Sequence, residues 1–218
     1  MARHLDEHDI LVRQNEAVPI LHRVLATPDG RRFETVASRV APIQPFSIRT
    51  NFRGSTVSDG MTDPVVLYQS GGTSFIERSA VPRNTEWIDQ WKIIVGGAVP
   101  AGGRADKDGR YYGLIGVRVL PPGTACTETY LVVNRFETKA EAENFASYLR
   151  TKFVRFLVSL RTNTQHLYSE RFAFVPDLEM NRVWTDAELY AKYGLEPSEI
   201  AFIEAMMRPM DPAEAPDE

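Results

Sequence analysis

Two stretches of the chain carry side chains suited to contacting base edges in duplex DNA. They hold Arg49, Asn51 and Arg53 in the first stretch, and Gln165 and His166 in the second. Arginine pairs well with guanine, and asparagine or glutamine pairs well with adenine, in the major groove. We therefore expect these five side chains to contact bases, with Phe46 and Phe52 anchoring the first stretch. Composition alone favours the alternative that this stretch is a solvated connector.

Basic side chains that could hold phosphates lie in two further places, one on a helix and one in a loop. Arginine and lysine bind DNA phosphates without reading sequence, and so position a protein on the duplex. The candidates are Arg150, Arg155 and Arg161 on the helix, and Arg104, Lys107 and Arg110 in the loop. We expect the loop to be mobile, because glycines precede it. The alternative for the helix is a core helix whose basic face is only solvated.

The net charge of −4 at first argues against a nucleic-acid partner, but the acidic residues are unevenly distributed. From position 184 to the end, the chain has nine acidic residues against Lys192 and Arg208. The first 183 residues therefore hold 23 basic and 20 acidic side chains, a net charge of +3. The body of the protein can still present a basic face to an anionic partner.

The sequence lacks the motifs of several common catalytic classes. An adenine methyltransferase needs a glycine-rich cofactor loop and an Asn-Pro-Pro-Tyr or Asp-Pro-Pro-Tyr turn for the flipped base, and neither occurs. GxSxG, HExxH and paired CxxC motifs are absent as well. The single cysteine, Cys126, excludes an internal disulfide and fits a reducing cytoplasm. We expect no catalytic residue, metal site or cofactor in this chain.

A metal-dependent nuclease is the enzymatic alternative. Glu137 and Lys139 give the acid-x-Lys half of a common nuclease signature, and an upstream carboxylate would complete a Mg²⁺ site that activates water. The candidates for that carboxylate are Asp106, Asp108 and Glu128. Against this interpretation, Glu137, Thr138 and Lys139 already have a sufficient role as the start of a helix.

One long central helix is predicted over residues 138–163. Thr138 and Glu141 form a capping box at its start. Apolar residues then recur at helical spacing, and the stripe consists of Phe145, Leu149, Phe153, Phe156, Leu157 and Leu160. Strands are predicted at 63–67, 74–78, 91–95, 111–120, 126–134 and 171–175. The predicted fold class is α/β (α+β), a mixed sheet packed on that helix with short flanking helices at both ends.

The chain is predicted to form a single domain over residues 1–208. Its parts are a helical lead-in (1–40), the sheet with the long helix (41–183), C-terminal helices (184–208) and a disordered acidic tail (209–218). Thr185 and Glu188 repeat the capping-box pattern at the start of the C-terminal helices. No run of 18 apolar residues and no apolar leader segment occurs, so we expect a cytoplasmic protein without a membrane span.

Segments along nearly the whole chain resemble, in order, the C-terminal part of adenine-specific DNA methyltransferases from restriction-modification systems, including forms fused to an endonuclease. The segments are DILVR (9–13), AVPIL (17–21), PFSIRTNF (45–52), WIDQWK (87–92), CTETYL (126–131), FETK (136–139), YLRTKFVRF (148–156), FVP (174–176), YGL (193–195) and IAFIE (200–204). The Tyr-Leu-x-x-Lys pattern at 148–152 also resembles a helix of type I specificity subunits.

The resemblance implies that this region follows a catalytic domain and forms the target-recognition part. It implies that the catalytic half, with its S-adenosylmethionine, belongs to a separate methyltransferase domain or subunit. The expected partners are double-stranded DNA and that methyltransferase. The nuclease and a module that docks onto a methyltransferase without touching DNA stay open as alternatives.

Overall fold

The strands form two small sheets, where the sequence predicts one mixed sheet. The computed structural model describes residues 9–26, 34–164 and 166–210. The first sheet has the order β2-β1-β5 and contains β1 (Pro64–Gln69), β2 (Gly72–Glu77) and β5 (Thr124–Cys126). The second has the order β4-β3-β6 and contains β3 (Trp91–Gly96), β4 (Arg118–Leu120) and β6 (Tyr130–Phe136). β1 and β5 run parallel, whereas the other neighbouring strands are antiparallel.

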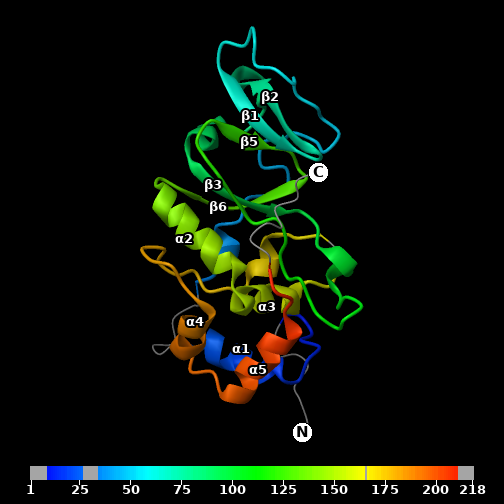
Figure 1. Ribbon diagram of the computed structural model, residues 1–218, viewed down its shortest axis with the longest axis vertical. Coiled ribbons are helices and arrows are strands. Elements are labelled where there is room, and N and C mark those ends of the chain that lie inside the picture. Colours follow the sequence, from blue (N-terminus) through cyan, green and yellow to red (C-terminus); the bar gives the residue numbers. More distant parts are fainter. Residues whose placement is uncertain (1–8, 27–33, 165, 211–218) are drawn as a thin grey trace.

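Five α-helices accompany these sheets in the described part of the chain, so the protein is mixed α/β. They are α1 (Ala17–Leu25), α2 (Lys139–Arg150), α3 (Lys152–Arg161), α4 (Asp186–Lys192) and α5 (Pro197–Met206). Figure 1 shows the first sheet at one end of the molecule, the second sheet beside α2, and α1, α4 and α5 at the other end. Short 3-10 turns lie at Val36–Ser38, Arg78–Ala80, Thr85–Asp89, Pro100–Gly103 and Ser169–Phe172. None of these described helices is long and apolar enough to cross a membrane.

The predicted long helix is broken at Thr151 into α2 and α3, which corrects that prediction. Thr151 has a ψ of 148°, outside the helical range. Its hydroxyl donates to the carbonyl of Tyr148 at 2.7 Å and accepts the N–H of Val154 at 3.2 Å. Thr151 is therefore the N-cap of α3. The predicted cap, Thr138, has the same role for α2, because its side chain also accepts a backbone N–H three residues on.

A second cap for α3 comes from Asp186, the first residue of α4. Its carboxylate accepts the backbone N–H groups of Lys152 at 3.1 Å and Phe153 at 2.8 Å. These N–H groups lack partners within the helix, and a negative charge at this end also complements the helix dipole. The break between α2 and α3 is thus fixed by a residue that lies far away in sequence.

Replacing Asp186 with alanine is expected to lower the free energy of unfolding by about 1–2 kcal/mol, the usual loss for a helix cap. Urea unfolding followed by circular dichroism measures this change. Asp59→Ala removes an exposed acidic residue from the loop before β1 and is the matched control for charge. Equal unfolding midpoints for Asp186→Ala and the control would contradict the role of Asp186 as a cap.

Strand β3 separates two apolar cores. Ile93 and Val95 belong to the larger core with the helices, and Ile94 belongs to the smaller core with β1 and β5. This alternation follows from the two-residue period of a strand. Both faces of the second sheet are therefore covered, which leaves loops to carry the surface chemistry.

Other expectations divide into confirmed and corrected ones. The capping box of Thr185 and Glu188 is confirmed at the start of α4. The strand predicted at 171–175 is wrong, because this segment makes local turn bonds such as Val175 N–H to Phe172 O at 3.0 Å. Only 118–120 of the strand predicted at 111–120 is in a sheet. Of the tail predicted to be disordered (209–218), residues 211–218 lie outside the described residues.

Candidate nucleic-acid interface

The contact loop, which we define as residues 43–53, is anchored by buried apolar side chains. Phe46 is fully buried and packs edge-on against Trp87, with ring centroids 6.1 Å apart. Ile48 is buried as well. Phe52 is 38% exposed, so the expectation that it anchors the loop is wrong. The loop is held from its first half, and its second half faces solvent.

The three predicted base-contacting side chains of this loop are exposed. Arg49, Asn51 and Arg53 all project from its second half. The Nη1 of Arg53 donates to the carbonyls of Thr50 at 2.7 Å and Phe52 at 2.8 Å. These bonds turn the Arg53 guanidinium back onto the loop and stabilise a compact turn, on which Arg49 and Asn51 are exposed.

The first half of the contact loop has a strained backbone. Gln44 and Ser47 have φ values of 59° and 56°, in the left-handed region. Such residues cost about 1–3 kcal/mol each and persist where their surroundings fix them, often at binding sites. Here Ser47 N–H donates to Gln44 O at 3.0 Å, and the side-chain amide of Asn84 donates to Pro45 O. The loop is therefore held in one defined shape.

Four segments that are distant in sequence meet at a groove of about 300 Å³, namely 43–50, the position of Gly97, 128–131 and 166–168. Gly97 N–H donates to Thr129 O at 2.8 Å, and Leu167 N–H donates to Gly97 O at 3.0 Å. A Cβ on Gly97 would lie 2.9 Å from Thr129 O, so a side chain does not fit there. The lining residues are Ile43, Gln44, Thr50, Gly97, Glu128, Tyr130, Leu131, His166, Leu167 and Tyr168.

The groove brings the two predicted base-reading stretches together. Thr50, which lies between Arg49 and Asn51, shares its lining with His166. His166 is exposed, and its ring lies 6.3 Å from that of Tyr168. Gln165, the fifth predicted residue, lies outside the described residues.

The basic loop, which we define as residues 104–110, folds around Asp106. The carboxylate of Asp106 accepts the N–H groups of Asp108 at 2.9 Å and Arg110 at 3.0 Å, and also accepts Nη1 of Arg208 at 2.8 Å. The bond from Arg110 N–H is the largest cause that holds the pKa of Asp106 below its usual range. Asp106 thus gives a defined turn to a loop whose predicted phosphate-binding side chains are exposed, namely Arg104, Lys107 and Arg110.

Two of the predicted phosphate-binding residues on the helix are buried, which corrects their assignment. Arg155 is 2% exposed, and its guanidinium donates to the carbonyls of Arg150 at 3.1 Å and Arg208 at 2.8 Å. Arg161 is 5% exposed and makes a bidentate ion pair with Asp9 at 2.6 and 2.7 Å. Both guanidinium groups stabilise the interior, so neither residue is a phosphate contact.

Arg150 is intermediate in burial between the exposed residues of the basic loop and the buried Arg155 and Arg161. Its Nη2 donates to the carbonyl of Val117 at 2.7 Å, and its side chain is half-buried. Burial lowers the pKa of its guanidinium. Arg150 therefore joins the end of α2 to the segment before β4.

The carboxylates of the nuclease alternative are dispersed. Glu128 precedes β6 and Glu137 follows it, so they lie at opposite ends of a seven-residue strand. Glu137 accepts the side-chain amide of Gln90 at 3.0 Å, and Lys139 pairs with Glu143 at 3.0 Å. Among the residues that the structure describes, no group of three or more His, Cys, Asp or Glu side chains could hold a metal ion.

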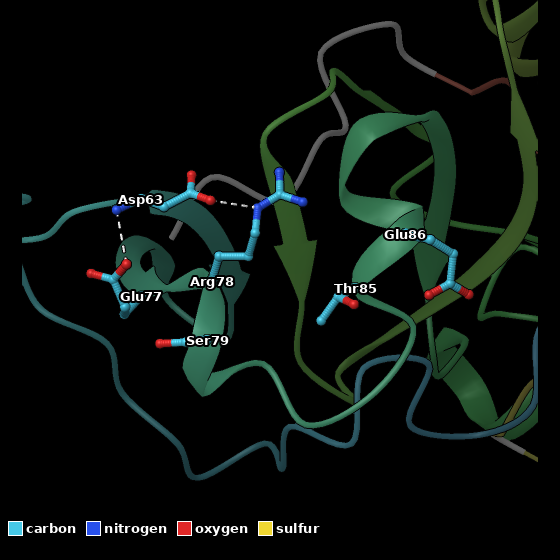
Figure 2. Close-up of a pocket in the computed structure, with 6 residues that line it drawn as sticks. All are labelled: Asp63, Glu77, Arg78, Ser79, Thr85 and Glu86. Carbon is cyan, nitrogen blue, oxygen red and sulfur yellow. Dashed lines mark hydrogen bonds and ion pairs between the residues drawn. The ribbon is translucent and has the colours of Figure 1, made fainter.

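An acidic hollow of about 480 Å³, which shares no lining residue with the groove, lies beside β2 (Figure 2). Arg78 pairs there with Asp63 at 2.8 Å and with Asp89 at 2.5 Å, and this guanidinium lowers the pKa of Asp89. Glu77 and Glu86 add further negative charge to its lining. This end of the molecule is unsuited to a polyanion.

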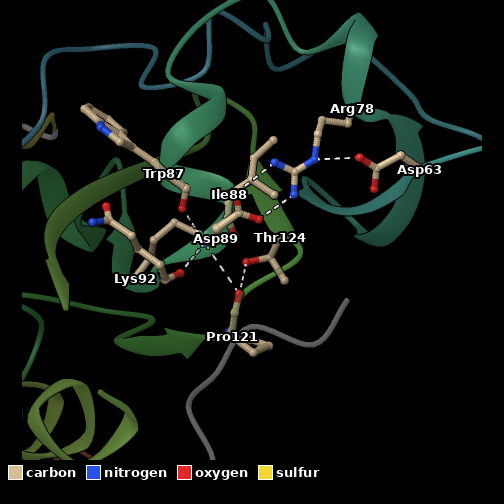
Figure 3. Close-up of polar contacts among 9 residues, drawn as sticks. Asp63, Arg78, Trp87, Ile88, Asp89, Lys92, Pro121 and Thr124 are labelled. Atoms are coloured by element: carbon tan, nitrogen blue, oxygen red, sulfur yellow. Dashed lines mark hydrogen bonds and ion pairs between the residues drawn. The ribbon is translucent and has the colours of Figure 1, made fainter. Parts of the chain in front are cut away.

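Lys92 in β3 is a buried cation that sequence reasoning missed, although a lysine within an apolar strand is a signal for one. It is 0% exposed. Its Nζ lies within hydrogen-bond distance of four backbone carbonyls (Figure 3), those of Gln90 at 2.7 Å, Trp87 at 2.9 Å, Ile88 at 3.2 Å and Pro121 at 3.5 Å. Burial lowers its pKa to about 8. These bonds fasten the turn at Thr85–Asp89 to the second sheet.

Comparison of the chain with known protein families and with curated proteins found no matching family model and no matching protein.

Proposed function

We propose that the protein recognises a short duplex DNA sequence as the target-recognition part of an adenine-specific DNA methyltransferase or of its fused restriction enzyme. The observation that supports this most is the meeting of the contact loop and the 166–168 segment at one groove. Thr50 and His166, which lie more than 100 positions apart, both line this groove, and Arg49 and Asn51 are the neighbours of Thr50 in the chain. The sequence resemblance to target-recognition regions supports the same proposal.

The exposed side chains divide into two roles under this proposal. Arg49, Asn51, Arg53 and His166 contact base edges, where arginine favours guanine and asparagine favours adenine. The basic loop, which runs from the Gly97 side of the groove, contacts phosphates and sets the position of the protein on the duplex. S-adenosylmethionine and the methyl transfer belong to the partner methyltransferase, and the protein acts in the cytoplasm.

Selection from a library of randomised duplexes, followed by affinity measurement at several salt concentrations, tests this proposal. We expect the selected duplex to bind more tightly than a scrambled one, and affinity for both to fall as salt rises, because bound phosphates release counterions. Absence of salt-dependent DNA binding by the chain would contradict the proposal. Enrichment of no common sequence would contradict the recognition role in particular.

A further inference from the structure

We infer that Glu128 is a positioning residue that holds the contact loop in its DNA-reading shape, an inference that rests on the proposed function. Its carboxylate bonds the loop at two points. Oε1 accepts the N–H of Thr50 at 3.1 Å, and Oε2 accepts the side-chain amide of Gln44. Its own N–H donates to Ile48 O at 2.9 Å. One residue therefore fastens both ends of segment 44–50 and a point between them.

The Thr50 bond is the important one for recognition. Thr50 lies between Arg49 and Asn51, so fixing its amide fixes the backbone from which both side chains project. The Thr129 hydroxyl also donates to the Thr50 hydroxyl, but at 3.5 Å this bond is long, so the Glu128 carboxylate is the stronger partner of Thr50. A loop that is already ordered before binding loses less conformational entropy when DNA arrives.

The Gln44 bond stabilises the strained half of the loop. Gln44 and Ser47 both hold positive φ values that most side chains avoid. Without the carboxylate, Gln44 loses the side-chain partner that keeps it in this conformation. The loop then gains alternative backbone shapes that do not present the same side chains to a base.

The hydrogen bonds of Glu128 favour recognition, whereas its negative charge opposes binding to DNA of any sequence. Glu128 lines the groove beside Thr50 and His166, where the polyanionic DNA approaches under the proposed function. The carboxylate of Glu128 and the DNA phosphates are both negative and therefore repel each other. Glu128 is therefore expected to weaken contact with DNA of any sequence while it sharpens the choice among sequences.

Two substitutions separate these effects. In Glu128→Ala, the ratio of specific to non-specific affinity is expected to fall on the order of tenfold, about the discrimination at one base pair, while non-specific affinity rises. Glu128→Gln keeps an oxygen that can accept the Thr50 N–H but removes the charge. It is expected to retain most of the ratio and to share the rise in non-specific affinity. Glu143→Ala, which removes an exposed acid from α2, controls for charge.

Hydrogen exchange of the Thr50 amide tests the same inference without DNA. Exchange is expected to accelerate in Glu128→Ala and to stay unchanged in Glu143→Ala, with amides of the buried α3 protected in both. Unchanged Thr50 exchange and an unchanged affinity ratio in Glu128→Ala would overturn the inference. If the wild-type chain binds no DNA, the proposed function fails, and the exchange result still decides whether Glu128 fixes the loop.

Discussion

Replacing Arg104, Lys107 and Arg110 together with alanine is expected to weaken binding to every duplex on the order of 100-fold at physiological salt. Each lost phosphate contact lowers the slope of log affinity against log salt by about 0.9, so three contacts lower it by roughly 3. The ratio of specific to non-specific affinity should stay nearly constant, because phosphates carry no sequence information. Fluorescence anisotropy at a series of salt concentrations measures all three quantities.

The matched control removes three exposed or half-exposed basic side chains elsewhere. Lys139 begins α2, Lys192 ends α4 and Arg182 precedes α4. These elements lie on the opposite side of Figure 1 from the loop that follows β3. The combined alanine variant of these three has the same net charge as the basic-loop variant. An equal loss of affinity in both variants would mean that total charge, and not the basic loop, determines binding.

The stability difference between wild type and Lys92→Met is expected to shift by about 2 kcal/mol in favour of wild type between pH 8 and pH 10. Burial lowers the pKa of Lys92 from 10.5 to about 8 in the fold. Between these values the unfolded chain binds more protons than the folded one. Stability from this group therefore rises with pH and is lost again as pH falls through 8. The methionine side chain does not ionise, so the stability of Lys92→Met lacks this dependence on pH.

Comparing the two proteins is necessary because other groups titrate in the opposite direction. Burial raises the pKa of the Cys126 thiol to about 12 and raises the pKa values of Tyr148, Tyr190 and Tyr193. These groups lower stability as pH rises. The tyrosines are common to both proteins and cancel in the difference, and burial keeps the Cys126 thiol protonated in both folds up to pH 10, although Lys92 lowers its pKa in the wild type. Urea unfolding at each pH gives the two free energies, and a difference that stays constant from pH 8 to pH 10 would contradict a buried ammonium.

Local sequence signals predicted individual elements better than their connections. The capping residues Thr138 and Thr185 mark real helix starts, because their partners lie three residues away. The break at Thr151 was missed because the apolar stripe continues through it in nearly the same phase. The residue that fixes the break, Asp186, lies 33 and 34 positions from the amides it caps. Such a contact has no signal in periodicity.

Exposure was the least predictable property of the candidate site. The side-chain types of Arg49, Asn51 and Arg53 are enough to predict a contact loop, and all three are exposed in the structure. Arg155 and Arg161 were misassigned because a basic helix face usually points to solvent, whereas here carbonyls and Asp9 bind both guanidinium groups in the interior. Burial of an arginine depends on partners from distant segments, which a single sequence does not show.

Site-specific photo-crosslinking tests the central claim, that the groove side of the molecule contacts DNA, most directly. A benzophenone amino acid would replace Phe52, 38% exposed in the contact loop, or Val183, 51% exposed before α4. We expect the selected duplex to crosslink at position 52 and not at position 183. Crosslinking at position 183 without crosslinking at position 52 would contradict the account.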